Sequence, residues 1–194
     1  MKNKIIFTAF AVVLAALACA GPSTFINRDT DWTFYKRIGV LPLTNLTQDR
    51  FAGEKVQSAL ITELFLSRRF DVVEPGEFNS KASDALKAAN AQAGQELSLD
   101  LIKAIGQKAE VQGVIEGIVR EYTTVRVGQA EYPLISINVR MIDVPTGTVI
   151  WMTSYTKKGG PNLPIISLGE THTLGELTQK ACHDVVNDFT SKAF

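Results

Sequence analysis

Residues 134–156 read LISINVRMIDVPTGTVIWMTSYT, and this stretch decides the fold class. In its first half apolar and polar side chains alternate, with Ile135, Ile137, Val139 and Met141 standing between Ser136, Asn138 and Arg140. Strict alternation predicts a strand with one buried and one solvated face. The sequence DVPTG at 143–147 is typical of a turn. We therefore expect strands at about 134–143 and 149–156 to form a hairpin.

The segments before this hairpin add helices and further strands. The run RIGVLPL at 37–43 predicts a buried strand, followed by a loop at 44–47. Apolar residues at helical spacing predict a helix at about 52–67. A second short strand is expected at 70–73, and Pro75-Gly76 should end it.

Two helices and one strand complete the middle of the chain. An Ala-rich stretch predicts a helix at 80–93 that ends at Gly94. Ser98 is placed to cap a second helix, which runs to about Lys108. Residues 111–127 then have the composition of a strand.

The C-terminal helix is indicated by Thr173 and Glu176, which form a capping-box pattern before a regular apolar stripe. The predicted order is therefore β-α-β-α-α-β-β-β-α. This order predicts one α/β domain at 37–194, in which a mixed β-sheet of about five strands packs with three to four helices.

The first residues have the layout of a secretory signal peptide. Lys2 and Lys4 precede an apolar run at 5–17 whose only polar member is Thr8, and no acidic residue occurs before Asp29. The run is too short to span a bilayer, which needs about 20 apolar residues. We expect residues 1–18 to be removed.

The end of this run, AALAC at 15–19, resembles the lipobox of bacterial lipoproteins. The resemblance implies cleavage before Cys19 and acylation of its thiol and its new amine, which would hold the protein on a membrane. Leucine usually stands three residues before the Cys, where this chain has Ala16. Ordinary cleavage after an A-x-A triplet, such as the one at 18–20, is the alternative.

A short N-terminal segment at 19–36 then links Cys19 to the domain. Ala20 follows the Cys, and the absence of Asp at that position favours the outer membrane. Residues 20–36 reach at most ~60 Å when fully extended. We expect part of this tether to pack on the domain, because it contains several large apolar residues: Phe25, Ile26, Trp32, Phe34 and Tyr35.

Charge and composition exclude several classes of protein. The 194 residues carry 20 Lys+Arg and 20 Asp+Glu, so there is no basic excess to indicate nucleic-acid binding. Hydrophobic residues make up 45% of the chain and charged residues 21%, which is globular composition. Two Cys and two His leave little for a disulfide scaffold or a metal site. We expect no metal and no cofactor.

Candidate catalytic groups are weak throughout. Cys182 and His183 are neighbours on one helix, so their side chains point about 100° apart and do not form a nucleophile pair. Cys182 lies near the apolar stripe, as a structural thiol does. Loop His172 should be solvated, and Glu116 and Glu121 should lie on opposite faces of a strand. Nucleophile-elbow, zinc-protease and Walker A patterns do not occur in the sequence, so we expect no enzyme and no small-molecule substrate.

Four segments together resemble the CsgG-like lipoproteins, a family named for the curli secretion channel of the outer membrane. These segments are 38–43 with Thr44-Asn45, 70–75, 114–117, and 139–144 with Thr146-Gly147 and Ile150-Trp151. The resemblance covers about residues 37–190. It implies a fold related to LpoB, a lipoprotein activator of a penicillin-binding protein, and to the N-terminal domain of TolB.

The resemblance also implies a periplasmic domain anchored at the outer membrane through acyl chains on Cys19. Its partners would be further copies of itself or other envelope proteins, as in curli assembly. The curli channel extends two long hairpins per subunit into the membrane, and the segments 121–136 and 155–173 are too short for such hairpins.

We therefore expect a non-enzymatic outer-membrane lipoprotein that forms or supports an envelope assembly or secretion complex. One alternative is an LpoB-like periplasmic adaptor of a cell-wall enzyme, against which the short tether argues. The other is a pore-forming channel subunit, against which the short hairpin segments argue.

Overall fold

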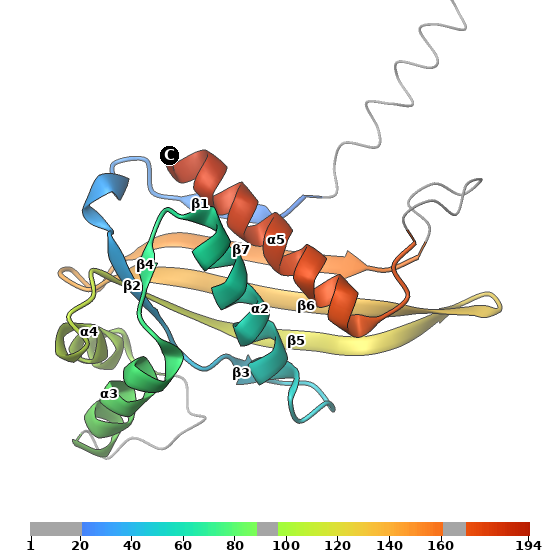
Figure 1. The fold of residues 1–194 in the computed structure, drawn as a ribbon, viewed down its shortest axis with the longest axis horizontal. Coiled ribbons are helices and arrows are strands. Elements are labelled where there is room, and N and C mark those ends of the chain that lie inside the picture. The colour runs from blue at the N-terminus through green and yellow to red at the C-terminus, as the bar shows by residue number, and fades with distance from the viewer. Residues whose placement is uncertain (1–20, 89–96, 161–169) are drawn as a thin grey trace, which may run out of the picture.

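A computed structural model describes residues 21–88, 97–160 and 170–194 and contains one seven-stranded mixed sheet with helices on both faces (Figure 1). The strands are β1 (Ser23–Ile26), β2 (Arg37–Val40), β3 (Thr44–Asn45), β4 (Asp71–Val72), β5 (Gly113–Val127), β6 (Ala130–Asp143) and β7 (Val149–Lys158). The helices are the 3₁₀ turn η1 (Trp32–Phe34), α2 (Ala52–Ser67), α3 (Pro75–Ala88), α4 (Leu99–Lys108) and α5 (Leu174–Ala193). Within this part of the chain, no helix has both the length and the apolar character needed to cross a bilayer.

The strand order is β1-β7-β6-β5-β2-β4, and β3 also pairs with β5. The neighbours β1, β7, β6 and β5 are antiparallel, whereas β2 and β3 run parallel to β5 and β4 runs parallel to β2. The antiparallel pairs β5–β6 and β6–β7 are joined by tight turns, whereas β1 and β7 are distant in the chain. Gly128 and Gly147 have positive φ, of 64° and 76°, in the two hairpin turns, where glycine adopts that conformation without strain.

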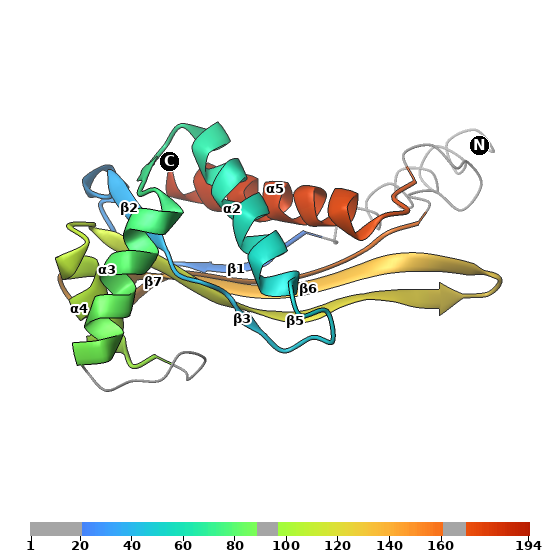
Figure 2. The ribbon, with the colours of Figure 1, turned by 60° about the horizontal axis from the view of Figure 1, so that its bottom comes forward.

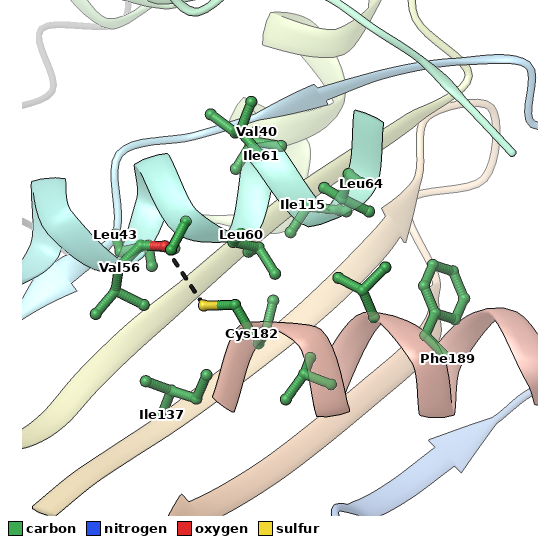
Figure 3. Close-up of a cluster of buried hydrophobic side chains, with 14 of the residues drawn as sticks. Val40, Leu43, Val56, Leu60, Ile61, Leu64, Ile115, Ile137, Cys182 and Phe189 are labelled. Carbon is green, nitrogen blue, oxygen red and sulfur yellow. Dashed lines mark hydrogen bonds between the residues drawn. The ribbon is translucent and has the colours of Figure 1, made fainter. Parts of the chain in front are cut away.

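Helices α2 and α5 cover one face of the sheet and form the larger core. Their apolar stripes meet the inward residues of β5, β6 and β7 around Trp151 and Phe189, whose rings stack 4.2 Å apart. Figure 3 shows Leu60 and Leu64 of α2 facing Cys182 and Phe189 of α5 above the strands. This packing fixes both helices on the same side of the β5–β6 hairpin.

Helices α3 and α4 cover only one end of the opposite face. Phe78 of α3 is fully buried there, and its ring lies where a side chain at Gly39 would stand. Ala82 and Ala85 face this second core, which also contains Ile102 and Ile105 of α4. Among the described residues, no helix lies over the rest of that face (Figure 2).

The predicted α/β class is confirmed, and so is the predicted element order once two short strands are added. The sheet has seven strands rather than about five, because β1 lies in the expected tether and β3 in the expected loop at 44–47. The helices at 52–67 and from Ser98 to Lys108 are confirmed. The Ala-rich helix begins at Pro75, because proline fits the first turn of a helix, where its missing N–H is not needed. Its predicted end at Gly94 lies outside the described residues.

Candidate functional site

The N-terminal segment is attached firmly to the domain from Ser23 onward. Cys19, the predicted lipid-attachment residue, and the signal peptide at 1–18 lie outside the described residues. Strand β1 begins four residues after Cys19 and pairs with β7 over its whole length. The ladder continues past β1, since the Asn27 N–H donates to the Ile150 carbonyl at 2.9 Å.

Side chains tie this segment to α5 and to the core. The Thr24 hydroxyl donates to Asp188 of α5 at 2.5 Å and lies 2.9 Å from the Thr153 hydroxyl. Trp32 is buried and meets the Phe189 ring edge-on at 5.3 Å. From Ser23 to Tyr35 this segment is therefore part of the domain, in agreement with the expectation that part of the tether packs on it.

A buried hydrogen bond closes this attachment. The Tyr35 hydroxyl donates to the Asp143 carboxylate at 2.9 Å. Burial, followed by the hydrogen bond to Asp143, raises the pKa of Tyr35 well above its ordinary value. Tyr35 is therefore a neutral donor that stabilises the fold.

Cys182 and His183 point to different surroundings, as expected. The Cys182 thiol is fully buried and lies 3.7 Å from the Val56 carbonyl (Figure 3). Burial, with a smaller effect of Glu63, raises the pKa of Cys182 to about 12, so the thiol stays protonated and unreactive. His183 Nδ1 instead lies 2.9 Å from the Glu63 carboxylate on the surface.

The two glutamates of β5 share a face, which corrects the sequence-based expectation. A bulge between Val119 and Glu121 shifts the register, so that Glu116 stands opposite Arg140 and Glu121 opposite Ser136. Each is nevertheless unsuited to acid–base work: Glu116 accepts a hydrogen bond from Arg140 at 2.5 Å, and Glu121 is exposed. One unpredicted residue is enough to move every later side chain of β5 to the other face.

The second histidine lies on the surface. Exposed His172 lies 3.2 Å from Glu170, in agreement with a solvated loop histidine. Within the described ranges, no group of three or more His, Cys, Asp or Glu residues could hold a metal ion.

A cluster that the sequence analysis missed links β7 to α5. The Tyr155 hydroxyl donates to Asp184 at 2.6 Å, and Lys157 pairs with the same carboxylate. Burial, together with Asp184, raises the pKa of Tyr155 above its ordinary value. The period-two spacing of Tyr155 and Lys157 placed both on one face, but the partner on α5 was not visible in the sequence.

The outer half of the β5–β6 hairpin projects beyond both helix layers (Figures 1 and 2). The register puts Val125 opposite Tyr132 and Val127 opposite Ala130, all on one face. The pair Arg126 and Glu131 belongs to the other face. This projecting arm, residues 123–134, is therefore amphipathic.

Two shallow clefts, each of about 590 Å³, lie on the described surface. The first lies between the first turns of α2 and α5 and includes Lys55, Tyr122 and Thr178. The second lies beside β1, at the C-terminal end of α5, and includes Ile26 and Trp32. Both are open and lined by mixed side chains, so neither has the enclosed form of a substrate pocket.

Comparisons with known proteins identify the fold. No protein-family model matches the sequence, and no curated protein matches it. Among solved structures, the PelC dodecamer of Paraburkholderia phytofirmans is 16% identical and covers 85% of this chain and 95% of its own, with a TM-score of 0.52. Lipoprotein GNA1162 of Neisseria meningitidis is 20% identical and covers 80% of this chain and 99% of its own, with a TM-score of 0.50.

The chain therefore shares its fold with these two proteins. The LpoB C-terminal domain of Salmonella enterica is less similar, with 15% identity, coverage of 66% of this chain and 98% of its own, and a TM-score of 0.45. A score at that level does not bear on function. The resemblance to the curli channel stays a prediction.

Proposed function

We propose that this protein is a non-enzymatic lipoprotein of the bacterial outer membrane that faces the periplasm and forms or supports an envelope assembly or secretion complex. The observation that carries the proposal is the fold, which extends over 85% of this chain and matches a subunit of the PelC dodecamer. The lipobox-like sequence that ends at Cys19 supplies the anchor.

The short connection between Cys19 and β1 supports a role at the membrane surface. The four residues that lead to Ser23 span at most about 14 Å. An acylated Cys19 therefore holds the domain against the bilayer. An adaptor that reaches a distant cell-wall enzyme needs a longer tether, so we favour an assembly role at the membrane.

The described polar groups support a non-enzymatic role. The single buried thiol is kept protonated, and Glu116 is neutralised by Arg140. The clefts lack a convergent set of nucleophile, base and oxyanion donors. Binding between protein surfaces is the activity that we propose.

Labelling with palmitate in the native bacterium tests the anchor. We expect the wild-type protein to be labelled and to fractionate with outer membranes, and the variant Cys19→Ser to lose the label. Cys182→Ala is the matched control, because it removes the other cysteine and should keep the label. An unlabelled wild-type chain that begins at Gly21 would contradict the proposal.

A further inference from the structure

Besides the edges of the two-residue strands β3 and β4, the described part of the sheet has two longer unpaired edges, on opposite sides of the domain. In the described part of the chain, β1 pairs only with β7, so its outer edge is free. On the other side, β2 and β3 pair with β5 only as far as Val119. Beyond that residue, the edge of β5 is free over residues 120–127, most of which lie in the projecting arm.

Unpaired edges invite the addition of another strand, because their N–H and C=O groups lack partners. Within the residues that the structure describes, neither edge pairs with a further strand. On the projecting arm, Thr123, Thr124 and Val127 are exposed. At the other edge, Phe25 is 56% exposed and stands opposite Met152, which is 41% exposed. The second cleft adds open space directly beside β1.

The strand directions make these two edges complementary. Strand β1 is antiparallel to β7, β7 to β6 and β6 to β5, so β1 is antiparallel to β5 within one chain. A second copy with its strands in the same direction therefore offers a β1 that is antiparallel to the free edge of β5. Such contacts join different surfaces of two identical chains, and they close into a ring when the rotation permits.

We propose that the projecting half of β5 adds as a strand to β1 of the next copy, and that this edge-to-edge contact builds the assembly. The inference rests on the proposed function, since it names the interface of that assembly. The occupant is a second copy because both complementary edges belong to one chain and because the fold is shared with a dodecameric protein.

The register sets the stagger between copies. Through β7 and β6, Ile26 lies level with Ile115, and it must shift to the level of Tyr122, which is on the same face, to reach the free edge. That shift is about six ladder steps, or ~20 Å. One copy, counted as its four strands from β1 to β5 and the gap to the next copy, spans about 19 Å across the sheet. The strands then incline by about 45° to the ring axis, an inclination found in closed sheets.

Cross-linking of the full-length lipoprotein in its own membranes tests this contact. Phe25→Cys and Thr123→Cys put thiols on the same face of the two edges, at exposed positions that leave the core intact. With a flexible bismaleimide, the double variant should give a ladder of covalent oligomers. The two single variants expressed together should stop at dimers, because each chain then carries one half of the contact.

The matched control is Phe25→Cys with Leu66→Cys, since Leu66 is 67% exposed on α2 and belongs to neither edge. It should give no ladder. Native mass spectrometry of the same membranes separates the two proposals. If native mass spectrometry shows a multimer but the double variant gives no cross-linked ladder, the edge contact is wrong and the proposed assembly is still supported. A monomer overturns both, and dimers from Phe25→Cys alone would indicate a symmetric contact and overturn the proposed one.

Discussion

The two halves of the β5–β6 hairpin share one ladder but have different surroundings. In the inner half, Ile115, Ile137 and Met141 are fully buried under α2 and α5. In the outer half, Val127 is 48% exposed, although it still pairs with Ala130 in the same ladder. The inner half stabilises the fold because the helices bury its side chains. The outer half lacks this cover, so its surface is available for another contact.

Truncation of a side chain should separate the two halves most strongly. We expect Ile137→Ala to lower the free energy of unfolding by about 2–5 kcal/mol, because it removes buried methyl groups and leaves a cavity. Val127→Ala should cost less than about 0.5 kcal/mol in the monomer, as exposed substitutions usually do. Urea unfolding of both variants measures the difference, and equal losses would show that the arm is also part of the core.

Glycine substitutions should destabilise the two halves for different reasons, a steric clash in the inner half and backbone strain in the outer half. A Cβ at Gly117 would come within 2.4 Å of the Asn138 carbonyl oxygen, so Gly117→Ala forces the strands apart. We expect a loss of about 1–3 kcal/mol. At Gly128 nothing lies within 4 Å, and its φ of 64° is the only obstacle, so Gly128→Ala should cost about 1–2 kcal/mol and Gly128→Asn less. A Gly117→Ala variant of wild-type stability would mean that the strands separate freely there.

The buried thiol of Cys182 on α5, which packs in the same core as the inner half of the hairpin, should make the free energy of unfolding depend on alkaline pH. The pKa of Cys182 is raised to about 12 from an ordinary value of 9, so the folded state holds a proton that the unfolded chain releases. The contribution of this protonated thiol to the free energy of unfolding is complete below pH 9. It is lost as pH rises from 9 towards 12, with a slope of about 1.4 kcal/mol per pH unit. Urea unfolding at several pH values should show that slope reduced in Cys182→Ala.

A thiol moved to the outer half provides the control for this pH effect. The variant Cys182→Ala with Val127→Cys has the same number of cysteines as the wild type. Because position 127 is exposed, a thiol there should have the same pKa in the folded and unfolded states. The pH dependence of the free energy of unfolding should therefore stay as weak as in Cys182→Ala. An unchanged slope in Cys182→Ala itself would contradict the role given to burial.

A smaller effect than that of core truncation is expected where the helix layer ends. The Thr173 hydroxyl accepts a hydrogen bond from the Glu176 N–H at 3.2 Å and begins α5 beside the arm. We expect Thr173→Ala to cost about 1 kcal/mol, with faster hydrogen exchange in the first turn of α5, and Thr173→Ser to keep most of the stability. Faster hydrogen exchange throughout the β5–β6 hairpin would mean that the cap at Thr173 stabilises the inner half as well.

The sequence predicted the elements that depend on local patterns. The helix at 52–67, the capped helix after Ser98 and the β6–β7 hairpin follow from periodicity, caps and turn residues, and the structure confirms all three. Strand β1 was missed because four residues of mixed polarity form a strand only when β7 offers its edge. The bulge beside Glu121 was missed because nothing in the local sequence marks it.

The candidate site was less predictable than the fold. Cys19, the predicted lipid-attachment residue, belongs to a local motif and was therefore predicted from sequence alone. The projecting arm and the two free edges depend on where β2 and β3 stop pairing with β5, near Val119. That boundary is set by tertiary packing, so only the structure reveals which surfaces are unpaired.

Native mass spectrometry of the full-length protein, extracted from its own membrane in mild detergent, tests the central claim most directly. The account predicts an assembly of many subunits, each carrying acyl mass on Cys19. A lipidated monomer would contradict the assembly, and an unmodified chain that begins at Gly21 would contradict the membrane anchor as well.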